Sequence, residues 1–318
     1  MVESTREGSM EEEIGGGVIE VADLIWRVPV PLPGNKRPAD INVYAIQDAD
    51  CALHLVDAGW DTEEAWYALS QGLRRIGHVV EDVRSVTVTH LHRDHRGLAE
   101  RLRQVSGATL AMHRHDAAAQ FVSRAVGEDE LDAWGVPPAA RTALRDATPV
   151  EQPPTTVDRV LSDNATIEIP GRPAKVIHTP GHTAGSVCVA LANERLVLTG
   201  DHVLPDQFPG IGLGGPDRND RNHLLEYRRS LELLSTMGDW VALPGHGEPI
   251  TNLPARIEEI LRHHEGRSSD VLGVKATRPH ATVWETAQSV KWSAGWDGLS
   301  PWHRISALRQ TEMHLTAV

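Results

Sequence analysis

The chain has 318 residues, a formal net charge of −13 with the histidines counted neutral, and 40% hydrophobic residues. This length suits one large α/β domain with a small appendage, and the acidity argues against a protein whose main contacts are nucleic-acid phosphates. The sequence contains no run of about eighteen apolar residues, so we expect no membrane span.

The start of the chain predicts an acidic tail rather than a targeting signal. Residues 1–17 contain several glutamates and lack the positively charged start and the apolar core of a secretory signal. We therefore expect residues 1–17 to be flexible and the protein to be cytoplasmic.

The next part of the chain reads as strands followed by a helix. Residues 19–58 have the pattern of strands, but the proline-rich bend at residues 26–33 cannot lie in a central strand. Residues 61–76 have a helical period of apolar side chains, with Asp61 as a suitable N-cap.

A cluster of ligand-type side chains follows the β-branched run at residues 85–89. His90, His92, Asp94 and His95 offer the nitrogen and oxygen ligands that zinc and similar metals prefer. Because His90 and His92 are two residues apart, they point to the same side while the strand continues, and a turn then directs the other two toward a second centre. The motif therefore predicts a site for two metals, and the alternative is a polar loop with hydrogen-bonded histidines.

Four arginines lie in or just after this cluster, where residues 98–105 predict a helix. These arginines could meet an anionic substrate tail, but such charge runs are usually a solvated helix face, and we favour the latter interpretation. They are Arg93, Arg96, Arg101 and Arg103.

Three further ligand candidates each follow an apolar run and stand in a turn marked by glycine or proline. They are His182, Asp201 and His246. Active sites gather at such strand ends, because the sheet fixes residues that the loops leave accessible. Residues 222–237 predict a helix over one face of the sheet. A helix after Pro254 is expected to end near His263 and His264, which we expect on the surface.

The last fifty residues predict further helices. Residues 281–290 and 301–315 look helical, and the second helix has Ser300 as N-cap and Pro301 at its first position. Four tryptophans in this region are expected to pack it against the main domain or a second subunit, although aromatic residues can also line a pocket. We therefore include a homodimer among the expectations.

These motifs, from the mid-twenties to His264, resemble the metallo-β-lactamase superfamily in the binuclear arrangement of glyoxalase II and lactamase-beta-2-like proteins. The resemblance implies an α/β fold with four layers, αββα, and a small C-terminal helical, winged-helix-like domain. It also implies two metal shells. The first would be formed by His90, His92 and His182, the second by Asp94, His95 and His246, with Asp201 as the bridge between them.

The resemblance further implies a residue that orients a ligand. The family has a buried aspartate after its third strand, and Asp57 fits that position; a turn-forming aspartate before Gly59 is the alternative. The two cysteines, Cys51 and Cys188, stand in apolar segments and are expected to be buried. Because neither is in the ligand set, a β-lactam hydrolase is disfavoured.

In similar proteins, an early loop and a helical insertion border the substrate. Here these would be the bend at residues 26–33 and residues 117–150, and their apolar side chains would suit an acyl or aromatic group. Trp26, Phe121 and Trp134 are therefore candidates for the pocket, although packing onto the domain is an equal alternative. The resulting division is a tail (1–17), a catalytic domain (18–265) and a C-terminal helical domain (266–318), which ends where a wing would be expected.

The function implied is hydrolysis of a carbonyl ester, thioester or lactone of a small molecule by a hydroxide that bridges two divalent ions. Zinc is favoured, with iron and manganese as alternatives, and Asp94 would orient the nucleophile and carry a proton. A phosphodiesterase or ribonuclease is one alternative, but it requires a basic track that this chain does not obviously provide. An iron-dependent persulfide dioxygenase is the other, because it shares the His-x-His-x-Asp-His motif.

Overall fold

The computed structural model describes residues 17–34, 38–147, 153–214 and 221–317. The expected acidic tail, apart from its last residue, lies outside these ranges. In the described part, no helix has the length and apolar character needed to cross a membrane.

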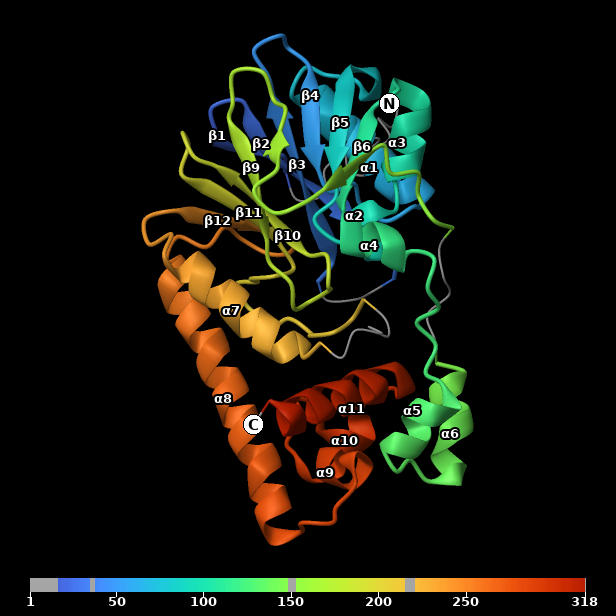
Figure 1. The fold of residues 1–318 in the computed structure, drawn as a ribbon. Helices are drawn as coiled ribbons and strands as arrows, with labels where there is room; N and C mark the ends of the chain where they lie inside the picture. Colours follow the sequence, from blue (N-terminus) through green and yellow to red (C-terminus); the bar gives the residue numbers. More distant parts are fainter. Residues whose placement is uncertain (1–16, 35–37, 148–152, 215–220, 318) are drawn as a thin grey trace, which may run out of the picture.

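Two β-sheets pack face to face in the main body of the molecule (Figure 1). The first sheet has seven strands in chain order: β1 (Ile19–Ala22), β2 (Ile25–Pro31), β3 (Asp40–Gln47), β4 (Leu53–Val56), β5 (Val83–Thr87), β6 (Thr109–His113) and β7 (Arg159–Leu161). The second has five strands in the order β12 (Val241–Pro244), β11 (Leu196–Gly200), β10 (Val187–Leu191), β9 (Ala174–His178) and β8 (Thr166–Ile167). Strands β4 to β7 are parallel to one another, as are β11 and β12.

The alternation of side chains along the strands builds a core on each face of the first sheet. In β3, Tyr44 and Ile46 belong to the core between the two sheets, whereas Val43 and Ala45 face the helices outside. A strand buried on both faces loses the polar alternation of a half-exposed strand. The apolar runs in the sequence therefore mark strands in the middle of the layers.

Helices cover the outer face of each sheet and complete the four layers (Figure 1). The first sheet carries α1 (Glu63–Arg75) and α3 (Ala99–Ser106), and the second carries α7 (His223–Ser235) and α8 (Leu253–Thr277). Shorter elements are a 3₁₀ turn (Val80–Asp82), α2 (Arg93–Arg96) and α4 (Arg114–Ala119). The expected αββα architecture is confirmed.

The first long helix shows how the local sequence sets its bounds. Thr62 caps α1 by accepting a hydrogen bond from the Ala65 N–H at 3.2 Å, so the cap lies one residue after the expected Asp61. Leu69 and Leu73 are fully buried against the first sheet. Their burial contributes about 1.5–3 kcal/mol each and holds the helix in place.

A group of helices packs beside the sandwich and is called the helical lobe here (Figure 1). The lobe consists of α5 (Glu128–Ala133), α6 (Pro138–Arg145), α9 (Val283–Ser289), α10 (Gly295–Gly298), α11 (Pro301–Thr316) and the second half of α8. The insertion and the C-terminal segment therefore share one core, in which Trp134 and Leu131 pack with Trp284 and Leu308. After β12 the described chain, up to residue 317, contains no strand of a wing.

The helix α8 differs from the expectation for the domain boundary. It was expected to end near His263 and His264, but it continues to Thr277 and passes through residues 265 and 266. His264 is only 2% exposed and lies beside Tyr227, so the expected surface position is wrong. The helix continues because its first half packs in the core under the second sheet and its second half packs in the core of the helical lobe.

The two cysteines lie in different surroundings. Cys188 is buried in β10, as expected, but Cys51 is exposed. Cys51 stands in the turn between β3 and β4 with φ of 63°, so its apolar neighbours in sequence belong to the flanking strands. Both thiols are free.

Candidate metal centre

Seven side chains with metal-ligand chemistry meet at one end of the two sheets. They come from the loop after β5, the loop between β9 and β10, and the turns after β11 and β12. They form two groups, the first being His90, His92, His182 and Asp201 and the second Asp94, His95 and His246. Within each group the candidate ligand atoms all lie within 4.8 Å of one another.

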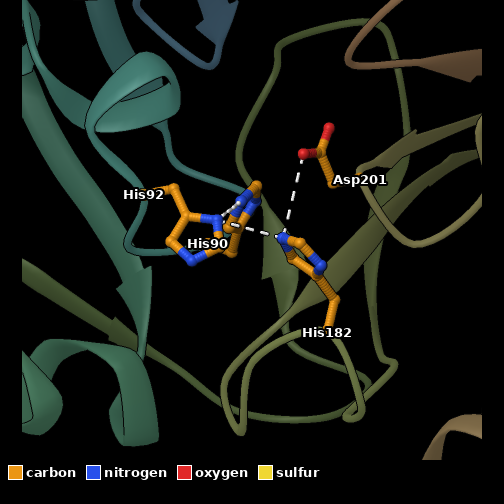
Figure 2. Close-up of side chains that lie close together, drawn as sticks. All are labelled: His90, His92, His182 and Asp201. Carbon is orange, nitrogen blue, oxygen red and sulfur yellow. Dashed lines mark hydrogen bonds and ion pairs between the residues drawn. The ribbon is translucent and has the colours of Figure 1, made fainter. Parts of the chain in front are cut away.

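The first group is centred on the His92 ring (Figure 2). His92 Nδ1 lies 2.9 Å from His90 Nε2 and 3.0 Å from His182 Nε2. Asp201 Oδ2 is 3.8 Å from the same His182 nitrogen. Three imidazoles and one carboxylate thus converge on one small volume.

The second group shares Asp201 with the first. His246 Nε2 lies 3.4 Å from Asp94 Oδ2, and the His95 Nε2 atom is 4.0 Å from that oxygen. Asp201 Oδ1 is 3.3 Å from His95 Nε2 and 3.5 Å from His246 Nε2. One oxygen of Asp201 therefore faces each group, which is the geometry required of a bridging carboxylate.

Three of the five histidines have their outer nitrogen fixed by a backbone carbonyl. The contacts are His182 Nδ1 to Gly210 O at 2.7 Å, His246 Nδ1 to Asp40 O at 2.6 Å and His92 Nε2 to Leu213 O at 3.2 Å. A carbonyl oxygen only accepts, so the outer nitrogen carries the proton in each ring. The inward nitrogen of a neutral ring then presents a lone pair.

Asp57 and Thr89 fix the other two rings in the same way. His95 Nδ1 donates to Asp57 Oδ2 at 2.7 Å, and the Thr89 hydroxyl donates to the same carboxylate. The hydroxyl oxygen is then left to accept from His90 Nδ1 at 3.1 Å. Asp57 is 2% exposed and has φ of 63°. Asp57 thus contacts the ligand candidate His95.

The inward nitrogen and oxygen atoms of the two groups are better suited to binding a pair of cations than to hydrogen bonding with one another. Two lone pairs facing each other at 3.0 Å, as on His92 and His182, repel unless a positive charge lies between them. The buried atoms His95 Nε2 and Asp201 Oδ1 lie 3.3 Å apart without hydrogen-bond geometry. Within the described part of the chain neither has another hydrogen-bond partner, which is rare for buried polar atoms. Nitrogen and carboxylate donors in this number suit zinc, with the outer hydrogen bonds as the usual support.

Burial and neighbouring charges set the protonation of the cluster. Burial lowers the pKa of His92 to about 3, with a contribution from His182, and it also lowers the pKa of His90. Neighbouring carboxylates raise the pKa of His95 and His246 against the effect of burial, so these two rings hold protons that a bound cation would replace. Burial opposes charge on Asp94 as well, but the two adjacent rings bring its pKa down to about 2. At neutral pH the first group thus offers neutral imidazoles and the second an ionised carboxylate.

A glycine lets the turn after β12 come close to the cluster. A Cβ on Gly245 would lie 2.7 Å from His95 Cε1 and 2.8 Å from Asp201 Oδ1. A real Cβ does not tolerate such distances, so any side chain there would displace two of the candidate ligands. Gly245 therefore allows the close approach of this turn to the ligand candidates, in addition to forming part of the turn.

Asp116 is a buried carboxylate that the sequence reasoning missed. It lies at 0% exposure in α4 and joins two of the ligand-bearing loops. Its Oδ2 accepts from Leu91 N–H and from the Thr183 hydroxyl, both at 2.8 Å, and its Oδ1 accepts from Gly185 N–H at 2.7 Å. Burial raises the pKa of Asp116 to about 6, against the effect of these hydrogen bonds. A single aspartate in a helix gave no sequence signal for this role.

A cavity of about 510 Å³ opens onto the two groups. Besides ligand candidates it is lined by Leu32, Pro38, Trp60, Arg93, Arg124, Leu204, Gln207, Phe208, Pro209, Gly210, Leu213, Trp302 and His303. Trp302 and His303 belong to the first turn of α11. The C-terminal segment therefore forms part of the wall of the site.

The three side chains expected in the pocket lie elsewhere. Trp134 is fully buried in the helical lobe, because the insertion packs against the C-terminal helices. Phe121 is 73% exposed, and Trp26 packs on the core beneath α1. Among the described residues that line the cavity, the aromatic ones are instead Trp60, Phe208 and Trp302, together with histidines.

A sandwich of two sheets between helices, with convergent His/Asp groups at one end, is the architecture of a metal-dependent hydrolase. A family model described as the metallo-beta-lactamase superfamily matches residues 37–246, and the chain belongs to this superfamily.

Known proteins similar to the chain agree with this assignment. The "Probable metallo-hydrolase YqjP" of Bacillus subtilis is 28% identical over 275 residues, which is 83% of each chain. An "Atrochrysone carboxyl ACP thioesterase" of Aspergillus chevalieri is 29% identical over 137 residues, 41% of each chain. The crystal structure of a "Beta-lactamase domain protein" from Burkholderia ambifaria superposes with a TM-score of 0.75 at 25% identity and covers 94% of this chain and 88% of that one. The chain is thus a metal-dependent hydrolase of this superfamily.

Proposed function

We propose that the chain hydrolyses a carbonyl ester, thioester or lactone of a small molecule, with two zinc ions in the two groups. The observation that supports this most strongly is the convergence of five inward nitrogens, each fixed from outside, around one carboxylate that faces both groups. His90, His92 and His182 would hold one ion, Asp94, His95 and His246 the other, and Asp201 both.

The residues of the site would have different roles in such a reaction. Two divalent ions held there would supply a water of lowered pKa and polarise the substrate carbonyl. Asp94 lies on the cavity wall and stays ionised at neutral pH, so it can accept a hydrogen bond from the attacking water and take a proton. Asp57 keeps the His95 ring in one orientation, and Asp116 keeps two ligand loops at a constant separation.

Among carbonyl substrates we favour a thioester with an apolar or aromatic acyl group. The cavity volume of about 510 Å³ has room for a small organic acyl group. Its wall carries the exposed ring of Phe208 and the partly exposed rings of Trp60 and Trp302. The similarity to a protein named an acyl-carrier-protein thioesterase supports the same choice.

A combined metal and substrate assay tests the proposal. Protein purified without added metal is analysed for zinc, iron and manganese, and then assayed on an ester, lactone, thioester and phosphodiester panel with oxygen uptake recorded. We expect two zinc ions per chain and turnover of a carbonyl substrate, lost on chelation and restored by zinc. One iron per chain with oxygen consumption would indicate the dioxygenase, and turnover of phosphodiesters alone would indicate the nuclease alternative.

A further inference from the structure

The four arginines around the metal-ligand motif have separate places in the structure. Arg101 pairs with Glu63 and Arg103 with Glu100 on the surface, as the solvated-face interpretation expects. Arg96 is buried and donates to the Leu91 carbonyl and the Thr155 hydroxyl. Arg93 instead lines the cavity. Of these four arginines, Arg93 is therefore the one on the described lining of the cavity.

A second guanidinium lies on the same wall. Arg124, from the segment between α4 and α5, also lines the cavity. Arg93 and Arg124 therefore place two guanidinium groups on the lining of one cavity.

The charged side chains on the cavity wall differ in balance from the whole protein. The net charge of the protein is −13, yet among the described residues that line the cavity the only carboxylates are Asp94 and Asp201, both ligand candidates. Outside the ligand set, the arginines on this lining are Arg93 and Arg124, and positive charge on the wall of a cleft attracts an anion.

Arg93 is held in a position suited to planar recognition. Its guanidinium carbon lies 4.5 Å from the centre of the Trp60 ring, an arrangement that restricts the orientation of the group. Arg93 also lines the same cavity as His92 and Asp94, so a group bound to it lies in the cavity that opens onto the candidate metal centre. A guanidinium binds a carboxylate or a phosphate through parallel hydrogen bonds.

We propose that Arg93 and Arg124 form a binding site for a carboxylate or phosphate group of the substrate, so that the enzyme selects anionic esters or thioesters. This rests on the proposed hydrolase function. The aromatic rings of Trp60, Phe208 and Trp302 would contact the remainder of the substrate. The anion could belong to the acyl portion or to the leaving thiol.

Paired substrates test this selectivity. Succinyl and butyryl thioesters of N-acetylcysteamine differ by a terminal carboxylate, and butyryl-coenzyme A adds phosphates to the leaving side. The kcat/KM of the wild type should be at least tenfold higher for an anionic thioester than for its neutral counterpart. Arg124→Gln should lower that preference by about tenfold to hundredfold, mainly through KM, and the preference lost identifies the side that carries the anion.

Two further variants serve as controls. Arg93→Lys keeps the charge but loses the planar fork, so it should retain part of the preference that Arg93→Gln loses. Arg101→Gln removes a surface arginine and should leave the preference unchanged. A wild type without preference for either anionic thioester, or an equal loss on charged and neutral substrates in Arg124→Gln, would overturn the proposal.

A binding measurement separates this proposal from the hydrolase function. Succinate and inorganic phosphate are titrated into the metal-loaded wild type and into Arg124→Gln and Arg101→Gln by calorimetry. We expect Kd to rise at least fivefold in Arg124→Gln alone. If no thioester is cleaved but this difference appears, the hydrolase proposal fails and the anion site stands. Equal affinities in all three proteins would refute the anion site even in an active enzyme.

Discussion

Buried histidines occupy two regions of this molecule with opposite surroundings. At the end of the sheets, five rings each have an outer nitrogen held by an acceptor and an inner nitrogen directed at other ligand candidates. At the packing interface of α7, α8 and α11, His264 is equally buried, but in the described structure neither of its ring nitrogens has a hydrogen-bond partner. Burial alone therefore does not mark a ligand candidate, whereas convergence on shared carboxylates does.

The largest expected effect comes from removing two converging rings. His90→Ala combined with His92→Ala should release metal and lower activity at least roughly a thousandfold, while the circular dichroism spectrum stays native. His54→Ala is the matched control, because both nitrogens of that buried ring already have protein partners, Asp48 at 3.0 Å and Ser85 at 2.8 Å. Metal stoichiometry and turnover are measured on both variants, and we expect His54→Ala to keep both. Full activity in the double variant would show that the converging rings do not hold a catalytic metal.

A packing residue in the helical lobe should change stability instead of selectivity. Trp134→Ala creates a cavity in a fully buried site and should lower the free energy of unfolding by about 3–5 kcal/mol. Denaturant unfolding measures the loss. Kinetics with a graded acyl series should show the same factor for every chain length, and a loss that grows with acyl size would instead place Trp134 in contact with substrate.

Substitution of Asp116 tests whether its hydrogen bonds hold the two loops that carry ligand candidates. Asp116→Ala removes the acceptor for three donors that join the loops of His92 and His182, so metal affinity should fall by about ten- to a hundredfold. Asp116→Asn keeps the size and one acceptor oxygen and should lose less. Chelator competition measures the affinity in both variants. An unchanged affinity in Asp116→Ala would show that the loops hold their positions without the carboxylate.

The last effect is a pH dependence from the packing interface. Burial, together with repulsion from His263, lowers the pKa of His264 to about 3, below the value near 6.5 of an unfolded chain. The neutral ring therefore contributes full stability above about pH 6.5, and this contribution falls as the pH drops toward 3, by up to about 1.4 kcal/mol per pH unit.

Metal-free wild type and His264→Leu provide the comparison for this slope. Denaturant unfolding between about pH 7.5 and 4.5 should show a shallower loss of stability in the variant. Parallel slopes would mean that His264 is protonated in the folded state or already neutral in the unfolded one.

The sequence predicted which side chains meet at the end of the sheets, because their signals are local. His90 to His95 form one short motif, and His182, Asp201 and His246 each follow a strand in a turn, so strand ends alone bring them together. Asp116, Arg124 and Trp302 carry no such signal, since their places depend on how α4, the insertion and α11 pack. The end of α8 was misjudged for a similar reason. Gly266 weakens the helix by about 1 kcal/mol, but the burial of Val271 in the helical lobe favours its continuation.

The continuity of α8 joins the helical lobe to the two-sheet sandwich. Its 25 residues extend roughly 37 Å, with Ile257 and Ile260 in the core under the second sheet and Val271 in the core of the helical lobe. The junction between the two cores is therefore an unbroken run of backbone hydrogen bonds, not a linker. An exchange of the helical lobe for that of a relative would therefore have to replace part of a continuous helix and the first turn of α11, which lines the cavity, at the same time.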